Sequence, residues 1–207
     1  MNSRPSGLAW MGGAFAATAA AAAVVLVWRG AGPAGTHVAL RVTARLAFLF
    51  FWPGYVGGAL TTLFGDAFRP AKIRARALGL AFAAALAVHL GLVSWLCWIG
   101  SPPAARTFEI FGAGVAWTAM LALLSIEPLG AAAQGRFWRT MRSLAVHYLA
   151  FLFILDFVRL APNQGPAELA QYLPFAALAV LGPLLRFAAW LKLVWRQKLA
   201  GLAAGES

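Results

Sequence analysis

Residues 77–99 read ALGLAFAAALAVHLGLVSWLCWI, an uninterrupted run without Asp, Glu, Lys or Arg. A helix needs about 20 predominantly apolar residues to cross the hydrocarbon core of a bilayer. At about 1.5 Å per residue, a helix over this run would extend for roughly 35 Å. The run therefore predicts a transmembrane helix, with His89 near its middle.

The rest of the chain has the same apolar character. Its 207 residues are 62% hydrophobic and 11% charged, and the mean hydropathy is +0.76. Soluble domains are about 45–50% apolar and about 25% charged, so this composition excludes a water-soluble globule and a disordered chain. The single cysteine, Cys97, lies inside an apolar run, which excludes a disulfide framework and a thiolate metal cluster.

Working outward from residues 77–99, we find five more stretches of spanning length, separated by Pro- and Gly-rich segments. The six predicted spans are 8–28, 38–64, 77–99, 108–125, 138–160 and 169–195. The last is longer than one bilayer thickness, so it either tilts or continues as a basic surface helix after Arg186. No loop is long enough for a separate domain. We therefore expect residues 1–207 to form one all-α bundle of six transmembrane helices.

The first span also has features of a secretory signal peptide, because Arg4 precedes an alanine-rich core. Residues 24–28 are bulky, however, whereas a cleavage site requires small residues. We therefore expect this span to be retained.

The charge balance predicts the orientation in the membrane. There are 17 Lys and Arg residues against 6 Asp and Glu, a net charge of +11. In a soluble protein such an excess suggests nucleic acid as a partner, but in a membrane protein basic residues gather at the cytoplasmic helix ends. With the N-terminus inside, cytoplasmic segments would hold 11 basic residues and outer segments 5. We therefore expect both termini in the cytoplasm, the lipid bilayer as the surroundings, and no nucleic-acid partner.

Ionisable side chains within the spans are the candidate functional residues. Neutral imidazoles can ligate haem iron, and side chains on facing helices build such sites. His89 and His147 lie on spans that run in the same direction. Counted from Arg76 and Arg142, their depths differ by about 8 residues, or roughly 12 Å; counted from Arg139 instead of Arg142, the difference is roughly 7 Å. The sequence thus allows the pair without requiring it, and hydrogen bonding within the bundle is the alternative.

Three further charged positions have two interpretations each. Arg41 and Arg45, at i and i+4, share a helix face and could hold haem propionates or meet lipid headgroups. Asp156 could pair with Arg159 at i,i+3, or with Arg45 at a similar depth.

Glycines in the second and fourth predicted spans predict close contacts between helices. They are Gly54, Gly57, Gly58, Gly112 and Gly114.

Several segments together carry a resemblance to a known family. Residues 75–82, with His89 ten residues after Gly79, resemble the third helix of the ferric reductase-like transmembrane domain family. The likeness continues at residues 43–48, 112–117, 135–138, 146–153 and 184–186. The family includes the haem-binding membrane subunit of the bacterial methionine-sulfoxide reductase system, and the membrane parts of NADPH oxidases and ferric reductases.

The resemblance implies a multi-pass protein of the bacterial inner membrane that holds b-type haem and transfers single electrons. His89 falls where the family has a haem-ligating histidine. Arg142 and Leu86 stand where relatives have other histidines, and Leu155-Asp156 where some relatives have another ligand, so the resemblance implies one haem or none. The predicted site is His89 and His147 as iron ligands, with Arg41 and Arg45 beside the haem propionates.

The chain has no G-x-G-x-x-G fingerprint after a strand and no room for a soluble reductase domain. It would therefore be an oxidoreductase subunit without its own flavin or nicotinamide domain, and its electron donor a separate flavoprotein or a quinone. Basic clusters at residues 69–76 and 136–142 could dock an acidic flavoprotein or only enforce topology. The rival hypothesis is a haem-free scaffold, or a subunit of a larger membrane complex, with the same fold.

Overall fold

The computed structural model describes residues 7–125, 129, 133–160 and 166–205, without the side chains at 159–160, 166–168, 201 and 203–205. Within these ranges the secondary structure is entirely helical, with seven α-helices and one 3-10 helix. The α-helices are α1 (Gly7–Arg29), α2 (Pro33–Phe64), α3 (Arg69–Ile73), α4 (Ala75–Trp98), α5 (Ala105–Leu123), α7 (Arg136–Leu160) and α8 (Pro166–Gly205). The 3-10 helix is η1 (Asp66–Phe68).

Five helices are long and apolar enough to cross a membrane. They are α1, α2, α4, residues Arg136–Val158 of α7 and residues Leu169–Ala200 of α8. Within the described residues, this confirms the expected all-α chain with several helices that could cross a membrane. The predicted span at 108–125 corresponds to α5, which does not reach the same hydropathy. Arg106 and Glu109 in the first turns of α5 lower its apolar character.

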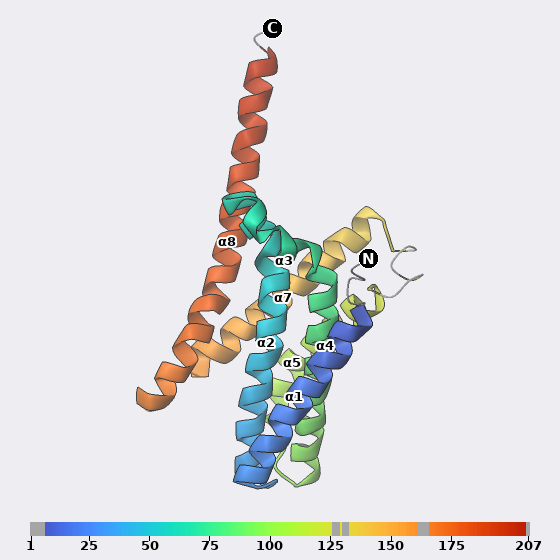
Figure 1. Cartoon of the computed structure of the whole chain (residues 1–207), viewed down its shortest axis with the longest axis vertical. Coiled ribbons are helices and arrows are strands. Elements are labelled where there is room, and N and C mark those ends of the chain that lie inside the picture. The colour runs from blue at the N-terminus through green and yellow to red at the C-terminus, as the bar shows by residue number, and fades with distance from the viewer. Residues whose placement is uncertain (1–6, 126–128, 130–132, 161–165, 206–207) are drawn as a thin grey trace.

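Most predicted boundaries lie within three residues of those in the structure, and two differ by more. The predicted second span begins at residue 38, whereas α2 begins at Pro33, because a proline fits the first turn of a helix without losing a hydrogen bond. The predicted last span ends at residue 195, whereas α8 continues to Gly205. It remains one helix past Arg186, and its C-terminal part projects beyond the other helices (Figure 1).

The long helices run alternately up and down the bundle, and both ends of the described chain lie towards the same end of it (Figure 1). Helix α2 packs against α1, α4 and α8, while α7 packs against α5 and α8. The core between them is rich in aromatic rings. The ring of Phe48 meets those of Phe153 and Phe157 edge-on, at centroid distances of 5.0 and 5.1 Å. Edge-on contacts of this kind add stability beyond that of the buried area alone.

Three glycines of α2 were expected to allow close helix contacts, and two of them, Gly54 and Gly57, do so. A Cβ atom on Gly57 would lie 2.8 Å from the backbone nitrogen of Lys72, and one on Gly54 would lie 3.4 Å from Cβ of Leu78. The space around Gly58 is open. Small residues therefore bring α3 and the start of α4 against α2, which is how helices gain van der Waals contact in membranes.

Candidate functional site

A cavity of about 490 Å³ lies among α2, α4, α5 and α7, with Tyr172 of α8 also on its wall. Its volume falls within the range of about 300–1,000 Å³ that is usual for ligand pockets. Most of the lining is aliphatic or aromatic. The ionisable groups on the wall are His37 and Arg41 from α2, His89 from α4 and Asp156 from α7.

His89 is held by a hydrogen bond to the neighbouring helix. Its Nδ1 lies 2.9 Å from Oγ1 of Thr43, and the same hydroxyl lies 3.0 Å from the carbonyl oxygen of Ala39. A hydroxyl has one hydrogen to donate. If Thr43 donates it to Ala39, then Nδ1–H of His89 donates to Thr43, and Nε2 keeps its lone pair. This is the arrangement that orients a metal-ligating histidine.

The two arginines of α2 have different surroundings, although both were expected beside the same ligand. Arg41 lines the cavity. The guanidinium carbon of Arg45 instead lies 4.9 Å from the ring centroid of Tyr172 and 5.4 Å from that of Phe175. These distances fit cation–π contacts. Arg45 therefore joins α2 to α8, and its buried Nε has no hydrogen-bond partner.

Asp156 lines the cavity from α7. Arg45, the partner expected in one of its two pairings, lies over the ring of Tyr172, which lines the same cavity. The other pairing involves the side chain of Arg159, which lies outside the described residues.

The structure does not bring His147 to the cavity. The His147 side chain is exposed, its Nδ1 lies 2.6 Å from the carbonyl oxygen of Ser143, and its ring centroid lies 5.8 Å from that of Tyr55. The histidine that shares the cavity with His89 is His37.

A second span that begins at residue 38, as the sequence predicts, leaves His37 just outside the helix, at the edge of a loop. Once α2 begins at Pro33, His37, Arg41 and Ala44 follow at i, i+4 and i+7, the spacing of one helix face. All three line the cavity. The signal was present in the sequence but depended on the helix start.

The chemistry of the cavity wall is compatible with haem. Haem iron needs only one or two protein ligands, and the imidazole of His89 lies on the wall. The apolar lining suits the macrocycle, and the cation of Arg41 suits the anionic propionates. Among the described residues, no group of three or more His, Cys, Asp or Glu side chains could hold a metal ion.

Comparison with known proteins finds no matching family model, no matching curated protein and no matching solved structure. The resemblance to the ferric reductase-like family thus remains a prediction from the sequence. The functional argument rests on the cavity and the residues around it.

Proposed function

We propose that this chain is a membrane protein that binds one b-type haem and transfers single electrons, in the manner of ferric reductase-like transmembrane domains. The observation that carries the proposal is the position of His89. Its imidazole borders an apolar cavity of about 490 Å³ and is hydrogen-bonded through Nδ1 to Thr43. An imidazole oriented by a hydrogen bond beside an apolar cavity is what a haem ligand requires.

Each residue has a defined part in this proposal. His89 ligates the iron, Thr43 fixes the plane of the imidazole, and Arg41 compensates the charge of the propionates. The apolar walls exclude water, and this burial tunes the reduction potential. His37 is the second histidine on the cavity wall. When bound, the haem itself supplies the one-electron chemistry.

The proposed topology has six passages in the bacterial inner membrane, with both termini in the cytoplasm. It counts α5 as the sixth passage, although α5 is less apolar than the others. The alternating helix directions support this count (Figure 1), as does the excess of basic residues on the proposed cytoplasmic side. The electron donor would be a separate flavoprotein or a membrane quinone.

The test is an absorption spectrum of the detergent-purified full chain, oxidised and then reduced with dithionite, with a pyridine haemochrome assay. We expect about one haem per chain. His89→Ala should lose the haem, whereas His147→Ala, the matched control on a histidine outside the cavity, should retain it. If His37 is the second ligand, His37→Ala should keep the haem but lose the sharp low-spin α-band.

A haem-free scaffold, or a subunit of a larger membrane complex, is the second candidate. It is favoured by the separation of His147 from the cavity that His89 lines. Under this hypothesis the Thr43–His89 hydrogen bond only joins α2 to α4. A chain that binds no haem even after reconstitution with hemin would support this candidate. Full haem content in His89→Ala would instead refute His89 as the iron ligand.

A further inference from the structure

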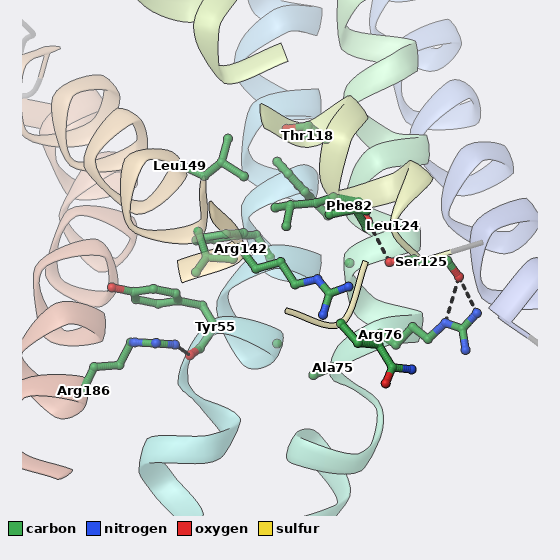
Figure 2. A pocket seen from close by; sticks show the side chains of 16 residues that line it. Tyr55, Ala75, Arg76, Phe82, Thr118, Leu124, Ser125, Arg142, Leu149 and Arg186 are labelled. Carbon is green, nitrogen blue, oxygen red and sulfur yellow. Dashed lines mark hydrogen bonds between the residues drawn. The ribbon is translucent and has the colours of Figure 1, made fainter. Parts of the chain in front are cut away.

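A second cavity, of about 510 Å³, lies towards the opposite end of the bundle. Three arginines line it, Arg76 from α4, Arg142 from α7 and Arg186 from α8, and Figure 2 shows their side chains among the lining residues. Phe82 and Leu149 border both this cavity and the one beside His89. These two side chains therefore lie between the two cavities. We call this second space the arginine cavity.

The described contacts of Arg142 and Arg186 use only part of their hydrogen-bonding capacity. Arg186 donates from Nη1 to the carbonyl oxygen of Tyr55 at 2.9 Å, and its guanidinium carbon lies 4.7 Å from the Tyr55 ring centroid. Arg142 donates from Nη2 to the carbonyl oxygen of Ala133 at 3.1 Å. A guanidinium carries five N–H donors. Both side chains therefore keep N–H groups that can donate hydrogen bonds to a ligand. Arg76 donates from Nε and Nη2 to the carbonyl oxygen of Ser125.

The described lining of the arginine cavity carries positive charge without a carboxylate. None of the carboxylates among the described side chains lines this cavity. Asp66 lies in η1, Glu109 lies near the start of α5, and Asp156 lines the other cavity. Arginines that only enforce topology extend outward to the headgroups, whereas these three line one space between helices. Because opposite charges attract, several cations around one space stabilise an anion bound in it.

The rest of the wall indicates that this anion belongs to an amphiphile. The inner part is apolar, with Phe51, Phe82 and Leu149, while Ser125 and Gln134 add polar groups to the wall. Arginine is the cation best suited to phosphate, because its planar fork can donate two parallel hydrogen bonds to phosphate oxygens. The cavity thus combines a phosphate-binding part with an apolar part.

We propose that the arginine cavity binds the phosphate group of an anionic amphiphile, held by Arg142 and Arg186, with its apolar part against Phe51, Phe82 and Leu149. The phosphate can come from an anionic lipid headgroup or from a soluble phosphate ester. Phe82 and Leu149 are shared with the cavity proposed for haem, but Arg142 and Arg186 do not line that cavity, so phosphate binding can be tested separately from haem binding.

The test is native mass spectrometry of the detergent-purified full chain, titrated with phosphatidylglycerol and, separately, with phosphatidylcholine. We expect tighter binding of the anionic lipid. The double variant R142Q/R186Q should weaken that binding at least about tenfold, because it removes the charge-assisted hydrogen bonds to the phosphate. The control is R196Q/K198Q, which removes the same charge from exposed positions on the projecting part of α8 and should bind like the original chain.

Competition separates the two sources of phosphate. Displacement of phosphatidylglycerol by millimolar phenyl phosphate assigns the site to soluble phosphate esters, and the absence of displacement assigns it to lipid. Equal binding of the two lipids by the original chain would overturn the proposal without any variant. An equal loss of phosphatidylglycerol binding in R142Q/R186Q and R196Q/K198Q would overturn it as well. The loss would then depend on the net charge of the protein and not on the arginines of the cavity.

Discussion

At the scale of single residues, the function proposed for His89 depends on Thr43. The Thr43 hydroxyl is buried and lies within hydrogen-bonding distance of both Ala39 O and His89 Nδ1. It therefore links the backbone of α2 to the ring on α4. Without this link, the imidazole would lose its side-chain hydrogen bond to α2.

We predict that Thr43→Val destabilises the protein by about 1–3 kcal/mol, the usual effect of leaving a buried polar group unsatisfied. Haem content should also fall, because the ligand is no longer oriented. Thermal unfolding in detergent and the haemochrome assay measure the two effects. Thr118→Val is the matched control, since this buried hydroxyl donates to the Gly114 carbonyl oxygen at 2.8 Å and contacts no imidazole. Identical behaviour of the two variants would refute the orienting role of Thr43.

Arg41 and Arg45 show the limit of prediction at this scale. Their i,i+4 spacing indicates a shared helix face, yet Arg41 lines the cavity while Arg45 lies over two rings of α8. The spacing predicts which face of the helix each residue lies on. What a long side chain contacts there depends on the neighbouring helix, and the local sequence does not identify that helix.

At the scale of the helices, α2 packs against α1, α3, α4 and α8. Its glycines allow α3 and α4 to approach, and its face at His37, Arg41 and Ala44 lines one wall of the cavity. A difference of five residues in the predicted start of α2 was enough to leave His37 out of the predicted site.

The adjacent pair Gly57 and Gly58 tests the packing of α2. We expect Gly57→Ala to destabilise the protein by about 1–3 kcal/mol, because the new methyl group would meet backbone that cannot move aside like a side chain. Gly58→Ala, where a Cβ has open space, should be neutral or stabilising by up to about 1 kcal/mol. Thermal unfolding of both variants in one detergent measures the difference. An equal loss of stability in the two would contradict the close approach of α2 and α3.

At the scale of the whole molecule, the question is whether α5 crosses the membrane. Six crossings place the two chain ends on the same side, and five place them on opposite sides. The structure has both described ends towards one end of the bundle (Figure 1), and the basic residues favour the cytoplasm for that end.

We predict that green fluorescent protein fused after Gly205 fluoresces and that alkaline phosphatase at the same point is inactive. Alkaline phosphatase inserted between α4 and α5, after Ser101, should be active. An active phosphatase fusion after Gly205 would contradict the six-pass topology. A fusion at the N-terminus is the control for the orientation of α1.

The sequence alone determined that this chain is helical and belongs in a membrane. The length of an apolar run and the absence of charge within it are local properties, and in lipid a segment must satisfy its own backbone hydrogen bonds as a helix. The sequence also marked His89 and Arg41 as unusual. Only the tertiary structure decided that His37 joins them, that Arg45 faces α8 and that His147 lies apart. The reason is that contacts between helices depend on where each helix starts, how it is rotated and which helix it meets, and all three are settled by packing across the whole bundle.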